Sequence, residues 1–225
     1  ALSAVERATA ENANLPILKN IVIHADSKIR ISATNLEIGV NYLTVGKIQE
    51  QGGVSVPLQP LYNIIQNSDS ERIQLSAEKN TLTVKTDNYE AKIQGMSEEE
   101  FPIIPKIEDS AHHIKIESST LREAFNQIIS AAQMSELKPE LSGVFFDFQA
   151  TILKLVATDS YRLAEKTLLN NAFENTFTKG FKIIIPLKTV QEVIRIFAAD
   201  GEVKIFVDPH QILFTNETTQ FISRL

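Results

Sequence analysis

Residues 139–166 read PELSGVFFDFQATILKLVATDSYRLAEK, and they repeat a pattern first met in residues 15–40, LPILKNIVIHADSKIRISATNLEIGV. Each stretch begins with a leucine-containing turn and continues with an apolar strand, a short polar turn and a second strand. In each stretch, Ala-Thr followed by Asn or Asp comes at the end of the second strand. Thr34-Asn35-Leu36 in the first copy therefore corresponds to Thr158-Asp159-Ser160 in the second copy. This recurrence predicts two copies of one structural unit.

The correspondence extends beyond these strands. Residues 54–66, VSVPLQPLYNIIQ, match residues 183–195, IIIPLKTVQEVIR, and each segment is an apolar strand that runs into a proline at the start of a helix. Pro57 and Pro186 suit the first helical turn, where a missing N–H costs nothing. After each helix, the sequence predicts three short alternating strands, in residues 72–96 and in residues 202–225.

These repeats predict an α+β fold of duplicated domains, each with two helices packed on antiparallel sheets. We place the first domain at residues 1–110 and the second at residues 111–225, joined by an acidic, proline-containing linker at residues 97–113. The second copy opens with a strand and a helix, and Thr120 and Glu123 have the spacing of a capping box for that helix. The predicted apolar stripe of this helix comprises Leu121, Phe125, Ile128, Ile129 and Ala132.

Composition bounds the class of protein. Of the 225 residues, 43% are hydrophobic and 22% are charged, and the net charge is −6, which is typical of a folded globular protein. No apolar run approaches the roughly 20 residues that a membrane span needs, and a chain without cysteine has neither disulfides nor thiol chemistry. We expect a cytoplasmic protein that does not bind membranes. Acidic chains are unusual binders of nucleic acid, but such a chain can be locally basic where DNA passes.

Seven segments, in order along the chain, resemble the bacterial DNA polymerase III beta subunit, the sliding clamp. They are LPILKNI, SATNLEI, EEEFP, PELSGVFFDF, LVATDSYRLA, IIIPLKTVQEVIRIF and QFISRL. The resemblance implies three copies of the unit in each chain, and two chains that join head to tail into a closed ring. Helices would line the hole and strands would form the outer shell.

The same resemblance implies a non-catalytic accessory subunit of the replicative DNA polymerase. The ring would encircle duplex DNA, without sequence preference and without a cofactor or metal, at the nucleoid during replication. It would tether the polymerase, the clamp loader and other partners through short peptides. The first copy lacks the strand that opens the second copy. We therefore expect a chain trimmed at both ends, which holds domain one without its first strand and most of domain two, with the third domain absent.

The polar stretch at residues 158–163 corresponds to one wall of the groove where partner peptides dock in that family. By position, the residues implied for this groove are Leu141, Thr158, Ser160, Tyr161, Arg162 and Leu163. Leucines can form an apolar floor for an anchor residue, and Thr158 and Arg162 can bind the polar groups of the peptide. Family members often have Gly-His where this chain has Ser160-Tyr161. Because Asn35 stands at the matching site of the first copy, we interpret Asp159 as a turn residue.

The predicted helices each have one apolar stripe and therefore one solvent-exposed (wet) face, which the ring would present to DNA. Basic side chains are few on these faces, but a ring that encloses DNA needs only weak phosphate contacts. A loop at residues 131–141 approaches DNA in the family. The candidates for DNA-facing residues are Arg7, Arg122, Ser135, Lys138, Lys188 and Arg195.

Two other function classes stay open on the residues alone. An enzyme would depend on Asp159, because none of the four histidines has metal-ligand spacing and no phosphate-cradling glycine loop or nucleophile elbow occurs. A protein-interaction scaffold unrelated to DNA is the stronger rival, since duplicated α+β units can serve many partners. Retention on DNA separates the scaffold from the clamp.

Overall fold

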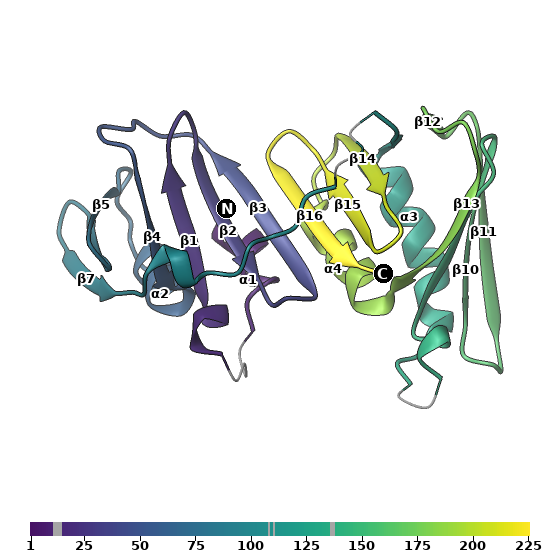
Figure 1. Ribbon diagram of the computed structural model, residues 1–225, viewed down its shortest axis with the longest axis horizontal. Helices are drawn as coiled ribbons and strands as arrows, with labels where there is room; N and C mark the ends of the chain where they lie inside the picture. The colour runs from purple at the N-terminus through teal and green to yellow at the C-terminus, as the bar shows by residue number, and fades with distance from the viewer. Residues whose placement is uncertain (11–14, 108, 110, 136–137) are drawn as a thin grey trace. The chain divides into compact units, whose positions relative to one another are not determined.

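A computed structural model describes residues 1–10, 15–107, 109, 111–135 and 138–225 of the chain. The described chain divides into two compact units, Ala1–Pro105 and Lys106–Leu225. Each unit combines a pair of α-helices with antiparallel strands (Figure 1). The units are described in turn as unit one and unit two.

Unit one contains two sheets. Four of its strands lie side by side in the order β3-β2-β1-β4, and three more form a small sheet in the order β5-β6-β7. The element bounds are α1 Leu2–Glu6, a 3₁₀ turn η1 Pro16–Lys19, β1 Asn20–Ala25, β2 Ile29–Thr34, β3 Ile38–Thr44, β4 Gly52–Pro57, α2 Leu58–Gln66, β5 Gln74–Glu78, β6 Thr81–Lys85, β7 Glu90–Gln94 and a 3₁₀ turn η2 Glu98–Glu100.

Unit two is built in the same way. One sheet has the order β11-β10-β9-β13, and the strands of the other follow the order β12-β8-β14-β15-β16. The element bounds are β8 Ile114–Glu117, α3 Ser118–Ile128, the 3₁₀ turns η3 Ile129–Ala131 and η4 Pro139–Leu141, β9 Gly143–Phe148, β10 Ile152–Thr158, β11 Leu163–Leu169, β12 Phe173–Asn175, β13 Phe181–Pro186, α4 Leu187–Ile196, β14 Glu202–Val207, β15 Gln211–Thr215 and β16 Thr219–Arg224.

The duplication read from the sequence is present in the structure, which confirms the α+β prediction. A 3₁₀ turn and three antiparallel strands open the repeated part of each unit, as η1 with β1 to β3 and as η4 with β9 to β11. A strand that ends in proline then leads directly into a helix, and the helices begin at Leu58 and Leu187, one residue after Pro57 and Pro186. Three short strands follow each helix, as predicted.

The predicted start of the helix in the second copy is wrong. Helix α3 begins at Ser118, and Thr120 therefore lies inside its first turn and cannot cap it. Ser118 is buried and its hydroxyl donates to the backbone carbonyl of Phe197, a long-range contact that holds the start of the helix. A capping box satisfies free N–H groups locally, whereas here tertiary packing decides where the helix begins.

The apolar stripe of α3 is confirmed along the helix itself, up to Ile128. Leu121, Phe125 and Ile128 are buried, but Ile129 and Ala132 are only half-buried, and Ala131 is buried instead. The chain tightens into the 3₁₀ turn η3 after Ile128, and three residues per turn bring a different side chain to the buried face.

Helices of unit two pack across one face of the four-stranded sheet, α3 against β10 and β11, and α4 against β9 and β13 (Figure 1). The buried face of α4 carries Leu187, Val190 and Val193, and its opposite face is exposed at Lys188, Gln191 and Arg195. Each helix thus has the wet face that the sequence predicts. Within the described residues, no helix has the length and apolar character that crossing a membrane requires.

Candidate functional site

The polar stretch between β10 and β11 folds as a tight turn that its own side chains stabilise. Asp159 Oδ1 accepts hydrogen bonds from the backbone N–H groups of Tyr161 (3.0 Å) and Arg162 (2.9 Å). Thr158 Oγ1 donates to the carbonyl of Arg162 (2.8 Å) and accepts from the N–H of Ser160 (3.2 Å). Ser160 adopts a left-handed φ of 77° at the centre of the turn. These contacts define an Asx turn, as predicted for Asp159.

Unit one builds the same turn from different residues. Asn35 Oδ1 accepts from the N–H groups of Glu37 (3.0 Å) and Ile38 (2.9 Å), and Thr34 Oγ1 donates to the carbonyl of Ile38 (2.8 Å). Leu36 has a φ of 76°, within a degree of its counterpart in unit two. The turn is therefore a structural feature of the repeat, and any special function of unit two must come from the other side chains that it carries.

The two turns differ most at their last position. Ile38 is 3% exposed and belongs to the core of unit one, whereas the Arg162 side chain is 66% exposed. Arg162 Nε also donates to Asp159 Oδ2 at 2.9 Å. Hydrogen bonds from the Arg162 and Tyr161 backbone N–H groups, with this guanidinium contact, lower the pKa of Asp159 from 3.8 to about 2. Asp159 therefore stays ionised at neutral pH.

Large side chains project from the turn into solvent. Tyr161 is 96% exposed and Leu163 is 66% exposed. Leu163 lies directly opposite Thr158 in the β10–β11 ladder, so both point to the same face of the sheet. Leu141, half-buried on η4, lies directly before β9 at the same end of the sheet. The sequence-predicted groove residues thus gather at one end of the four-stranded sheet.

Lys138, the residue directly before η4, contacts this turn. Two hydrogen bonds join Ser135 to Ser142, from Ser135 N–H to Ser142 Oγ (2.8 Å) and from Ser142 Oγ to the carbonyl of Ser135 (3.1 Å). Lys138 Nζ then donates to Ser160 Oγ at 3.3 Å. The contact spans 22 residues, so residue spacing alone could not reveal it. Two residues predicted near DNA, Ser135 and Lys138, therefore lie beside the predicted groove.

The other predicted DNA-facing residues lie on the helices. Arg122 Nη1 donates to the backbone carbonyl of Ala198 (2.8 Å), which ties α3 to the end of α4. Arg195 is 55% exposed and pairs with the buried Glu192 three residues earlier at 2.9 Å. Lys188 and Arg7 are exposed on α4 and directly after α1. Part of the positive charge on these faces is thus already engaged within the protein.

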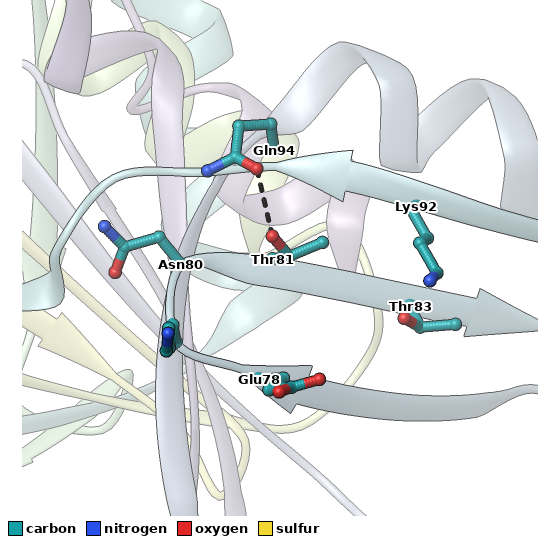
Figure 2. A pocket seen from close by; sticks show the side chains of 7 residues that line it. Glu78, Asn80, Thr81, Thr83, Lys92 and Gln94 are labelled. Carbon is teal, nitrogen blue, oxygen red and sulfur yellow. Dashed lines mark hydrogen bonds between the residues drawn. The ribbon is translucent and has the colours of Figure 1, made fainter.

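A hollow elsewhere on the surface holds none of the predicted residues. It lies over the small sheet of unit one (Figure 2) and has a volume of about 430 Å³. Thr81 Oγ1 donates to Gln94 Oε1 (2.9 Å) across its floor. Its lining consists of Glu78, Lys79, Asn80, Thr81, Thr83, Lys92 and Gln94. Ligand pockets are usually lined mainly by apolar side chains, so this polar surface does not compete with the turn as a candidate site.

The contacts of Asp159 give little support to a catalytic role for this residue. Asp159, the residue on which an enzyme would depend, has its carboxylate occupied by the turn and by Arg162. His112 Nδ1 pairs with Asp109 Oδ2 at 2.7 Å beside the second unit's first strand. Across the residues that the structure describes, no three His, Asp or Glu side chains gather as a metal site would require.

Comparison with known proteins gives the same family for both units. The family model described as DNA polymerase III beta subunit, N-terminal domain, matches residues 1–105, and the model of the central domain of the same subunit matches residues 115–225. The beta sliding clamp of Staphylococcus epidermidis is 30% identical over 233 residues, which cover 97% of this chain and 60% of that relative.

Solved structures show the same fold. The DNA polymerase sliding clamp of Bacillus subtilis superposes with a TM-score of 0.92 at 23% identity, covering 100% of this chain and 61% of that one. The Helicobacter pylori beta clamp, solved with a DNA ligase peptide, superposes with a TM-score of 0.87 at 20% identity, covering 100% of this chain and 62% of that one. The chain spans about 60% of the length of the relatives that it matches. It belongs to the family of bacterial DNA polymerase III beta subunits.

Proposed function

We propose that this chain is the part of a sliding clamp that holds the first two of three domains, and that the complete subunit tethers the replicative polymerase to DNA. The observation that carries the proposal is the match of two successive domains of one family to two successive units, in the same order. The share of its relatives that the chain covers supports the third domain. Two complete subunits would form the closed ring as a homodimer.

On the DNA side, the ring holds the duplex by enclosure. The helices and their ends carry Arg7, Arg122, Lys188 and Arg195, and each of these cations also interacts with other groups of the protein. Each phosphate that a protein neutralises adds to affinity and to salt dependence. Few available cations therefore support weak contacts without sequence preference, which let the ring slide.

On the partner side, the end of the sheet around the Asx turn of unit two forms one wall of a peptide groove. Leu141 and Leu163 supply apolar surface, and Tyr161 supplies a large amphipathic side chain. Thr158 already donates its hydroxyl hydrogen to the turn, so it offers a ligand its methyl group and its oxygen lone pair. The peptide-bound Helicobacter pylori clamp supports this type of partner. Clamp loader and polymerase would dock through such peptides.

The proposed protein is a non-catalytic subunit that works in the bacterial cytoplasm, at the nucleoid during replication. The test is primer extension on a singly primed circular template with the matching polymerase and clamp loader. The complete subunit should lengthen the products of each binding event from short fragments to thousands of nucleotides. If product length stays unchanged while partner peptides still bind, the protein is an interaction scaffold and the clamp function is rejected.

A further inference from the structure

An apolar strip crosses the four-stranded sheet of unit two on the face opposite to its helices. Phe146 and Ile185, each 0% exposed, belong to the face that the helices cover. Successive side chains of a strand alternate between faces, so Phe145 and Ile184 point to the other face. Phe145 lies directly opposite Val156 on β10 and Ile184 on β13. Phe145, Val156 and Ile184 therefore form one row across three strands, the apolar strip.

Gly143 lets Ile184 lie within this strip. A Cβ atom at position 143 would come within 2.6 Å of Ile184 Cγ2 and of the Ile185 carbonyl oxygen, which is closer than real Cβ atoms approach. Because glycine lacks this atom, the Ile184 side chain packs against the backbone of β9. Even so, Ile184 is 41% exposed and Phe145 is 36% exposed. The strip is thus fixed at its base and open towards solvent.

The strip continues into the proposed groove. Thr158 follows Val156 by two residues on β10 and lies opposite Leu163 on β11, so all three side chains point to the same face. From Leu163 to Ile184, the path crosses three strand spacings and one step of two residues, together about 16 Å. An extended peptide covers this distance in about five residues. A peptide anchored at Leu163 can therefore reach Ile184 with a residue that flanks its anchors.

Charged side chains beside the strip occur in equal numbers of both signs. Lys154 pairs with Glu165 at 3.8 Å, and Lys182 lies 3.9 Å from Asp147. At the end of the sheet that carries the groove, the charged residues are Lys138, Glu140 and the ion pair of Arg162 with Asp159. With these charges balanced, the surface favours an uncharged ligand, and the centres of protein interfaces are likewise poor in charged residues and rich in apolar ones.

We propose that the apolar strip extends the partner-binding groove and binds an uncharged segment that flanks the docking peptide of a partner, with one aliphatic or aromatic side chain over Phe145 and Ile184. This inference rests on the proposed function, because the strip continues the same groove. A side chain that covers the exposed 41% of Ile184 gains the matching share of the free energy of burying an isoleucine. The affinity should rise roughly three- to eightfold.

The test uses the complete clamp subunit and fluorescent synthetic peptides. All of them carry the same two apolar anchors and a five-residue extension, which ends in Leu in one peptide and in Ser in its twin. The extension precedes the anchors in one pair of twins and follows them in a second pair, so both directions of the bound chain are covered. In one of these pairs, the parent protein should bind the Leu peptide roughly three- to eightfold more tightly than the Ser peptide. The preference should persist at high salt, because salt screens charges and does not weaken apolar contacts.

Ile184→Thr keeps a β-branched side chain that suits a strand, and it should abolish the preference while the Ser peptide binds as before. Leu169→Thr is the matched control, since Leu169 is 54% exposed on the same face at the far end of β11, and it should keep the preference.

Equal affinity of the parent protein for the twins of both pairs would overturn the inference, and binding of the Ser peptides would still support the groove. Failure to bind any peptide would overturn the groove and the inference together. A preference that survives in Ile184→Thr, or that disappears in Leu169→Thr, would contradict contact with the strip.

Discussion

Leu163 offers the sharpest test of the groove, because it is exposed in the free protein and should be covered in the complex. Burying a whole leucine side chain is worth about 1.5–3 kcal/mol. About two thirds of Leu163 remains exposed, so a docked peptide that covers it can gain about 1–2 kcal/mol from this residue. Leu163→Ala in the complete subunit should therefore weaken peptide binding roughly 5- to 30-fold.

Leu169 supplies a control on the same strand. It is 54% exposed, and it lies opposite Ile152, on the same face as Leu163 and at the other end of the β10–β11 ladder. Six residues of strand place it about 20 Å from Leu163. Leu169→Ala should lower stability by a similar small amount, about 1 kcal/mol or less for a side chain already half in water, and should leave peptide binding unchanged.

Fluorescence anisotropy with a labelled partner peptide measures the affinities, and urea unfolding measures the stabilities. A loss of affinity in Leu163→Ala alone supports contact with the peptide. An affinity within twofold of the parent protein removes Leu163 from the groove, and an equal loss in both variants attributes the effect to the strand instead of the contact.

Two further predictions concern the turn itself. Asp159, whose native pKa of about 2 lies below the ordinary 3.8, should stabilise the fold fully above about pH 4 and lose this contribution as the pH falls towards 2. Asp159→Asn keeps a side-chain acceptor like the one that Asn35 uses in unit one, but it removes the titrating carboxyl group. The decrease in melting temperature between pH 5 and pH 2 should therefore be smaller in this variant than in the parent protein. An equal decrease in both proteins would contradict the assignment. Ser160→Gly should relieve a left-handed conformation that costs about 1–2 kcal/mol in L-residues, partly offset by the greater freedom of unfolded glycine. A gain of up to about 1 kcal/mol in urea unfolding is therefore expected, and a clear loss would show that the Ser160 hydroxyl contributes more to the turn than its backbone strain costs.

The Asx turn and the starts of the helices show which features of the fold could be predicted from the sequence. The Asx turn was predictable because Asn35 and Asp159 occupy matching places in two copies and share one chemical property, a side-chain acceptor for the following N–H groups. The helices after Pro57 and Pro186 were predictable because proline fixes the local backbone. The start of α3 was not, because Ser118 is held by the distant Phe197 carbonyl, and no local signal announces a contact across 79 residues.

The contacts of charged side chains were likewise predictable only where the two partners are close in sequence. The pairs Arg162–Asp159 and Arg195–Glu192 are three residues apart and could have been inferred from spacing. Arg122 reaches Ala198 across 76 residues and Lys138 reaches Ser160 across 22, so both depend on the packed fold. The sequence therefore indicated which end of which strand carries the candidate site, but not which cation lies beside it.

Enclosure of DNA is the central claim, and opening the DNA circle tests it most directly. The complete subunit is loaded onto nicked circular DNA, the salt is raised to screen phosphate contacts, and the bound fraction is measured by gel filtration before and after one restriction cut. Release within minutes of linearisation, with stable retention on the intact circle, is the predicted result. Equal retention on circular and linear DNA would mean that the protein binds DNA through surface contacts and does not encircle it. Loss from both at the same salt concentration would mean that it does not stay bound to DNA by enclosure.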